Sequence, residues 1–242
     1  MAGVSPRRAK GLSREDGDRP KRLWRGEVDA GGSPLAPSRK FDPSHRDILV
    51  DPDRARYLDP KAILARFPIR SGDAVADIGS GPGFFTVPIA EVVGHQGRVY
   101  AIDVEEPMLE DLRARVAERP ELCVTALRSI EDAVPLPDQS VDFAFMACVL
   151  HELEGLGTLR EASRILRPAG ALGIVDWKKI KQKIGPPREH RLTPHEAEEL
   201  LRRGGFLPKK PFEVGPYHYG LVAQLRWARA PKRAKSRRES SR

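Results

Sequence analysis

Three glycines at alternating positions, Gly79, Gly81 and Gly83, lie between two acidic residues, Asp77 and Asp103. Glycines at this spacing let the backbone turn sharply and approach a ligand closely, because no side chain stands in the way. A carboxylate at the end of the following strand can accept hydrogen bonds from both hydroxyl groups of a ribose. The combination predicts a binding site for a ligand that contains a nucleoside.

The glycine spacing and Asp77 also indicate which nucleoside is bound. A dinucleotide site would use G-x-G-x-x-G and present a helix N-terminus to a pyrophosphate, whereas this chain has G-x-G-x-G preceded by Asp77. A carboxylate beside the loop would repel a pyrophosphate and attract an ammonium group, such as that at the methionine end of S-adenosylmethionine (SAM). The pattern therefore favours SAM over NAD and argues against a dehydrogenase.

Methyl transfer from the sulfonium of SAM is an in-line displacement, so the protein mainly orients the reactants and needs no covalent catalytic residue. A general base matters when the acceptor is a phenol, an amine or an acidic carbon. His151 follows the apolar run 141–149 and is the candidate base or acceptor contact, with a helix-start or packing histidine as its alternative. The other candidates for the acceptor pocket, which are otherwise strand-edge or surface residues, are Glu152, Trp177, His190, Tyr217 and His218.

These residues fall where strands are expected to end. Strand-like runs at 74–78, 98–103, 122–127, 141–149 and 171–177 alternate with helix-like segments starting near residues 60, 84, 107, 159 and 194. Two further strand-like runs near 206–214 and 217–227 have no helix between them. The order predicts an α/β fold: a Rossmann-like, seven-stranded, mostly parallel sheet with an antiparallel edge hairpin and helices on both faces. Ligands of such sheets bind beyond the carboxyl ends of the strands.

The net charge of +8 belongs to the two ends of the 242-residue chain. Residues 1–40 carry +5 and residues 226–242 carry +7, whereas the remainder carries −4. Both ends are rich in polar residues and lack apolar periodicity, so we expect disordered basic tails at 1–40 and 229–242 around one domain at 41–228. Such tails can contact nucleic acid, although a solvated end is the favoured interpretation. The sequence does not indicate an oligomeric state.

Composition excludes several classes of protein. No apolar run is long enough to span a membrane, and the polar first thirty residues do not resemble a signal peptide, so we expect a cytoplasmic protein. Cys123 and Cys148 lie in apolar, strand-like runs and are expected to be buried, reduced thiols. The six histidines are scattered and neither cysteine has a close partner, so no metal site is predicted.

Four ordered motifs make the chain resemble the class I SAM-dependent methyltransferases, in particular the type-11 branch with its ubiquinone/menaquinone methyltransferase-like proteins. The first two are the stretch 75–85 around the glycine loop and the stretch 99–103 that ends in Asp103. The other two are 135–142, which is similar to the loop before the family's fourth strand, and 164–170, which is similar to the turn after it. The resemblance covers residues 41–227 and implies SAM as cofactor.

The resemblance also implies roles for single residues. Asp77, Ser80 and the backbone of the three glycines would hold the methionine end of SAM, and Asp103 would bind the ribose. Val104 and Met108 would pack near the adenine, although Met108 also fits an ordinary core position. The positions that match the family's adenine-amino contact hold Ser129 and Ile130, and Glu131 is an alternative partner. The segment 40–45 is expected to fold over the cofactor as a lid.

The sequence thus predicts an enzyme that moves a methyl group from SAM to a small-molecule acceptor. One alternative is an RNA or protein methyltransferase that recruits its substrate through the basic tails. The other is an adaptor that binds SAM without catalysis, which the intact glycines and Asp103 disfavour.

Overall fold

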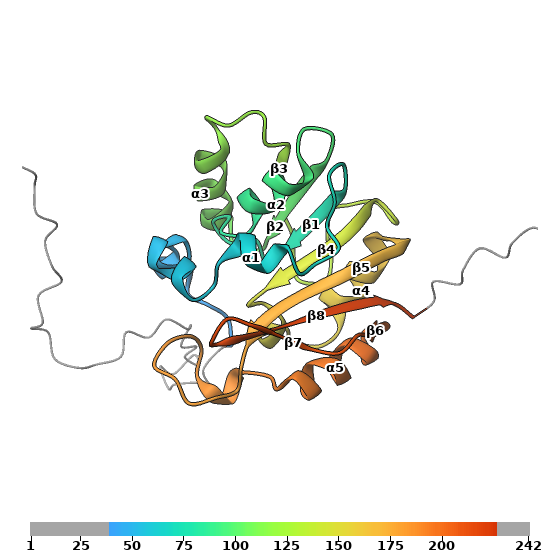
Figure 1. The fold of residues 1–242 in the computed structure, drawn as a ribbon. Helices are drawn as coiled ribbons and strands as arrows, with labels where there is room; N and C mark the ends of the chain where they lie inside the picture. Colours follow the sequence, from blue (N-terminus) through green and yellow to red (C-terminus); the bar gives the residue numbers. More distant parts are fainter. Residues whose placement is uncertain (1–38, 227–242) are drawn as a thin grey trace, which may run out of the picture.

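The structure is a computed structural model that describes residues 39–226 (Figure 1). The predicted tails at 1–40 and 229–242 therefore lie, except for Arg39 and Lys40, outside the described residues. No helix within 39–226 is long and apolar enough to cross a membrane.

A single sheet of eight strands runs through the domain in the order β3-β2-β1-β4-β5-β8-β6, with β7 also paired to β8. The first five of these pair in parallel, and β8 runs antiparallel to β5, β6 and β7. This confirms the predicted mostly parallel α/β sheet with an antiparallel edge. The strands are β1 (Ala74–Ile78), β2 (Arg98–Asp103), β3 (Val124–Arg128), β4 (Val141–Ala147), β5 (Leu166–Trp177), β6 (Phe206–Pro208), β7 (Phe212–Val214) and β8 (His218–Leu225).

The helices begin where the sequence supplies caps. Asp59 accepts hydrogen bonds from the backbone N–H groups of Lys61 and Ala62, and Thr193 and Glu196 form the predicted capping box. The α-helices are α1 (Pro60–Leu64), α2 (Thr86–Val93), α3 (Glu106–Val116), α4 (Gly157–Ile165) and α5 (Pro194–Arg203). Short 3₁₀ helices are η1 (Pro43–Val50), η2 (Pro52–Arg56), η3 (Leu150–Glu152) and η4 (Arg188–His190).

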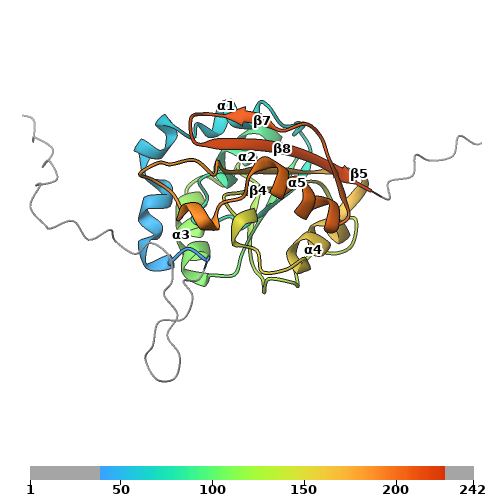
Figure 2. The same ribbon diagram turned by 90° about the horizontal axis from the view of Figure 1, so that it is seen from below.

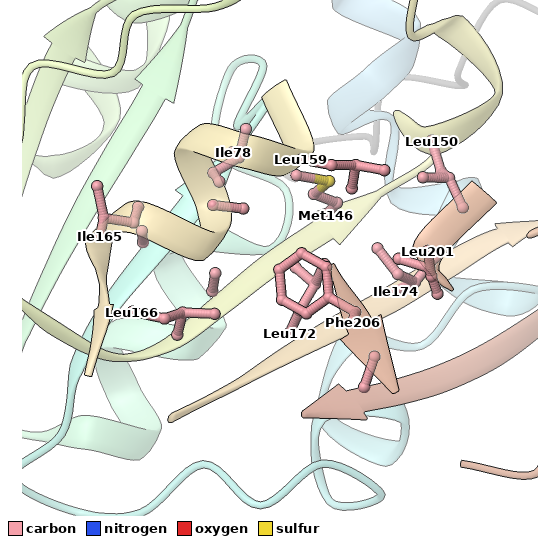
Figure 3. Packing of buried hydrophobic residues seen from close by; sticks show 14 of the residues in the cluster. Ile78, Met146, Leu150, Leu159, Ile165, Leu166, Leu172, Ile174, Leu201 and Phe206 are labelled. Atoms are coloured by element: carbon pink, nitrogen blue, oxygen red, sulfur yellow. The ribbon is translucent and has the colours of Figure 1, made fainter. Parts of the chain in front are cut away.

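Alternation along the central strand divides the core into two layers, one on each face of the sheet. Ala144 and Met146 of β4 pack with α4 and α5, and Figure 3 shows Met146 beside Leu159 on that side. Phe143 and Phe145 point to the opposite face and pack with α1 and α2. Helices therefore cover both faces, and the strand ends between the two layers are left to form a site.

The outer edge of the sheet differs from the prediction of seven strands. The run 206–214 is divided into β6 and β7, which both pair with β8 but in registers that differ by one residue. Pro211 has no N–H for the ladder, so a regular strand cannot continue through it. The sheet thus has eight strands because one predicted strand is divided in two, and no additional segment of residues 39–226 joins it.

Two smaller predictions were wrong. β5 begins at Leu166 and not at residue 171, because Leu166 already pairs with Val141 across a register shift, and most of the predicted turn at 164–170 therefore lies inside that irregular strand. Cys123 is exposed just before β3, and Cys148 is partly buried just after β4 with a positive φ of 60°. Both cysteines are thus beyond the strands that were expected to bury them.

Candidate active site

A cavity of about 570 Å³ lies at the carboxyl ends of the parallel strands, where the fold predicts a ligand. The loops after β1, β2, β3 and β4 line it, and the segment 40–57 and residues 183–186 of the loop after β5 contribute the remaining walls. Figure 2 shows the N-terminal 3₁₀ helices and the loop after β5 at the same end of the sheet. The cavity therefore has a rigid floor of strand ends and walls made by two irregular segments.

The three glycines of the loop have different surroundings. Gly79 has a φ of 71°, and a Cβ atom there would collide with Val149, whereas Gly81 lines the cavity and a Cβ there would only touch Leu49, at 3.7 Å. Gly83 does not line the cavity, and a Cβ there would collide with Leu112 of α3. The predicted role of Gly83 in ligand binding is therefore indirect, because this glycine allows the loop to pack against α3.

Asp103 connects the end of β2 to the glycine loop. One carboxylate oxygen accepts a 2.7 Å hydrogen bond from the Gly81 N–H, and the other accepts a 2.9 Å bond from the Glu105 N–H. The side chain lines the cavity although Asp103 is largely buried, and burial raises its pKa against the effect of these hydrogen bonds. Each carboxylate oxygen has a second lone pair, so two ribose hydroxyls can still donate to it.

Asp77 lies at the end of β1, is 2% exposed and also lines the cavity. Its Oδ2 accepts a 2.6 Å hydrogen bond from the Thr86 hydroxyl. Burial raises the pKa of Asp77 to about 7. A buried carboxylate with one neutral partner is a site for a cation, and the ammonium group of a methionyl ligand fits that requirement.

Of the residues predicted to contact the adenine, most but not all lie at the cavity. Val104, Met108 and Ser129 line the cavity, whereas Ile130 is 67% exposed and lies outside it. A tight turn closed by the bridge between Ile130 and Ala133 directs Ile130 away from the cavity. Val134, which the sequence did not single out, is buried and lines the cavity instead.

His151 forms a buried pair with Asp176 from the neighbouring strand. The Nδ1 atom lies 2.7 Å from Asp176 Oδ1, and the backbone N–H of His151 donates to Asp176 Oδ2 at 3.0 Å. Burial lowers the pKa of His151, but the carboxylates of Asp176 and Glu152 outweigh it and raise the pKa above its ordinary value. With Nδ1–H assigned as donor to Asp176, Nε2 is the acceptor atom of the ring.

Glu152 lies next to this pair and also lines the cavity. One of its oxygens is 3.8 Å from His151 Nε2, and burial raises the pKa of Glu152 to about 7. The backbone N–H of Phe41 donates a hydrogen bond to this carboxylate. Glu152 thus joins the strand ends to the N-terminal segment that covers them.

The four remaining candidates for the acceptor pocket divide into two groups. Trp177 lines the cavity, whereas His190, Tyr217 and His218 do not. His218 is fully buried behind the wall, with its ring 4.0 Å from Trp177 between ring centroids and stacked on Tyr57. Burial lowers the pKa of His218 to about 3, so this ring is neutral and packs as an aromatic group.

The N-terminal segment supplies cavity residues that the sequence analysis missed. These residues are Leu49, Arg54 and Tyr57. They line the cavity together with Phe41, which was part of the predicted lid. The ion pair between Arg46 Nε and Asp111 Oδ2, at 2.7 Å, attaches this segment to α3. No periodic pattern marks residues 49–57, because their position depends on how the segment folds over the strand ends.

The chain matches known methyltransferases in sequence and in structure. The family model for the type-11 methyltransferase domain matches residues 76–174. A crystal structure of a SAM-dependent methyltransferase from Aquifex aeolicus is 40% identical, with a TM-score of 0.73, and the match covers 76% of this chain and 98% of that one. A demethylmenaquinone methyltransferase from Symbiobacterium thermophilum is 27% identical over 61% of this chain and 73% of its own length.

A further relative is a protein of 37.1 kDa in a transposon of Streptomyces fradiae, which is 33% identical over 66% of this chain. The chain spans about half the length, 47%, of that relative. Together with the sheet order, the glycine loop and Asp103, these similarities define the class of protein. The chain belongs to the SAM-dependent methyltransferases and has the sheet order of class I, and the type-11 domain model matches its residues 76–174.

Proposed function

We propose that this chain transfers the methyl group of SAM to a small-molecule acceptor by in-line displacement. The observation that carries the proposal is that Asp103, which is anchored to the Gly81 N–H, and His151, which is paired with the buried Asp176, line the same cavity. The relatives that are named as quinone methyltransferases act on small molecules, which supports the same class of acceptor.

The residues at the strand ends fit the three parts of SAM. Asp103 would accept the ribose hydroxyls, Asp77 would pair with the ammonium group, and Val104 and Met108 would contact the adenine ring. Once bound, SAM supplies a methyl group that its sulfonium has already activated for displacement. The protein contributes orientation, which in model systems corresponds to effective concentrations of about 10⁵–10⁸ M.

We assign His151 as the general base. Asp176 accepts a hydrogen bond from the Nδ1–H group and thereby leaves the lone pair on Nε2, on the cavity side, where Glu152 is its neighbour. Nε2 would take a proton from an O–H, N–H or acidic C–H group of the acceptor. The O, N or C atom of that group would form the bond to the methyl carbon while the bond from the methyl carbon to sulfur breaks. Asp176 stabilises the imidazolium that results, because the carboxylate is within hydrogen-bond distance and buried.

The acceptor itself is accessible to experiment. The full-length protein is incubated with a metabolite extract and SAM labelled at the methyl group, and the labelled product is identified by mass spectrometry. A labelled small molecule that is absent with His151→Ala is the expected result. Label found only in RNA or protein would favour the alternative of a macromolecular substrate. Binding of the demethylated product S-adenosylhomocysteine (SAH) without any labelled acceptor would favour the SAM-binding adaptor.

A further inference from the structure

Arg54, in η2, is a buried cation in the wall of the cavity. Its exposed fraction is 9%, whereas Lys183, another cation of the wall, is exposed. Lys40 also lines the cavity and is paired with Glu131. Burying a guanidinium is costly unless an anion compensates its charge, so the partner of Arg54 needs to be identified.

The protein supplies only weak partners for this charge. Arg54 Nη1 donates to the Leu49 carbonyl at 2.6 Å, Nη2 lies 3.8 Å from the thiol of Cys148, and the guanidinium lies 4.5 Å from the centre of the Phe84 ring. Across residues 39–226, no carboxylate lies within ion-pair distance of Arg54. A carbonyl, a thiol and an aromatic ring satisfy some donors but leave the positive charge uncompensated.

The acidic residues closest in sequence are engaged elsewhere. Asp51 accepts a 2.8 Å hydrogen bond from the Asp53 N–H, and Asp53 forms an ion pair with Arg56 at 3.2 Å. Asp51, Asp53 and Arg56 are all exposed, so their charges are screened by solvent. Asp51 and Asp53 also line the cavity, but Arg54 is the charged residue of this segment that is buried in its wall.

We propose that Arg54 binds a carboxylate of a ligand in the cavity, which deepens the proposed function and depends on it. An arginine presents a planar set of N–H donors that matches a carboxylate, and its contact with Phe84 holds the guanidinium in one orientation. Phe84 directly follows the glycine loop, and Cys148 directly follows β4. Arg54 therefore lies where either the methionyl carboxylate of SAM or an anionic group of the acceptor would reach it.

The first arm of the test compares two cofactor fragments by calorimetry on the full chain. SAH carries the same amino-acid carboxylate as SAM, whereas 5′-methylthioadenosine lacks the whole amino-acid end. If SAM supplies the anion, Arg54→Gln weakens SAH binding by about 10- to 100-fold and leaves 5′-methylthioadenosine binding unchanged. Arg54→Lys should retain part of the SAH affinity, and Arg56→Gln, an exposed arginine of the same helix, should behave like the parent protein.

The second arm uses protein saturated with SAH and a pair of simple aromatic probes, benzoate and neutral benzamide, observed by NMR. If the acceptor supplies the anion, the parent protein prefers benzoate, and Arg54→Gln loses that preference while benzamide binding is unchanged.

The proposal is overturned if Arg54→Gln changes neither SAH nor benzoate binding. It is also overturned if the variant loses charged and neutral ligands equally, because Arg54 would then act only through folding, which thermal unfolding would reveal. Absence of SAH binding in the parent protein would instead contradict the proposed function itself.

Discussion

At the scale of single residues, the carboxylate of Asp176 influences the pKa of His151 and therefore the pH at which His151 can act as a base. Asp176→Asn removes a negative charge 2.7 Å from Nδ1 and should lower the pKa of His151, which the carboxylates hold above its ordinary value. Only neutral His151 accepts a proton, so methyl transfer should increase with pH through this pKa. In the variant, the increase should occur at lower pH.

The measurement is an NMR titration of the His151 ring in the parent protein and in Asp176→Asn. Glu154→Gln is the matched control, because Glu154 is an exposed carboxylate a few residues further along the chain. A His151 titration that is identical in all three proteins would show that Asp176 does not control the base.

Asp77 makes a separate prediction about protons. Its pKa is about 7 in the free protein because the side chain is buried, and a bound ammonium group should lower that pKa. Binding of SAH near pH 6.5 should therefore release a proton from Asp77 to the buffer, and the release should vanish well above pH 7. Calorimetry in buffers of different ionisation enthalpy detects this release. Proton release with 5′-methylthioadenosine, which has no ammonium group, would contradict the assignment.

At the scale of elements, Arg191 organises the loop between β5 and α5. This buried guanidinium donates to the carbonyl oxygens of Lys178, Ile180, Ile184 and Pro186, and the last two of these residues line the cavity. Arg191→Met should leave these carbonyls without their donor and should loosen the loop, because one side chain satisfies all of them.

Hydrogen exchange and limited proteolysis should report this change in residues 178–190. The sheet should remain protected, and Arg188→Met is the control, since Arg188 is exposed and makes a single long hydrogen bond of 3.3 Å to Lys179. Unchanged protection of the loop in Arg191→Met would show that the carbonyl contacts do not order it.

The elements also show how far sequence reasoning can reach. Glycine spacing, capping residues and apolar runs are local signals, and they located the strands, the capped helices and Asp77 and Asp103 at one edge of the sheet. The sequence did not predict that Arg54 and Tyr57 line the cavity. Their contact with it depends on how η1 and η2 fold over the strand ends, and no local sequence pattern indicates that path. His218 was misplaced for a similar reason: the start of β8 lies beside the cavity, but Trp177 and Tyr57 stand in front of it.

At the scale of the whole molecule, the net positive charge belongs to the two ends of the sequence. The basic ends lie almost wholly outside residues 39–226, and the part between them is mildly acidic. If the tails bind polyanions without serving catalysis, RNA binding should weaken steeply with salt and should decrease when residues 227–242 are removed. Methylation of the small-molecule acceptor should be unchanged by the same removal. Fluorescence anisotropy with a short RNA and the labelled-SAM assay measure the two effects, and methylation of the RNA would contradict this separation.

The most direct test of the account is the affinity of SAH for Asp103→Asn, measured by calorimetry beside the parent protein and Glu110→Gln, an exposed carboxylate of α3. Because Asp103 also accepts from the Gly81 N–H, the amide variant is preferable to alanine, which would release the glycine loop as well. We expect the parent and Glu110→Gln to bind SAH equally and Asp103→Asn to bind it about 10- to 100-fold more weakly, with a similar melting temperature. Equal SAH affinity in all three proteins would contradict the assignment of this cavity as the SAM site.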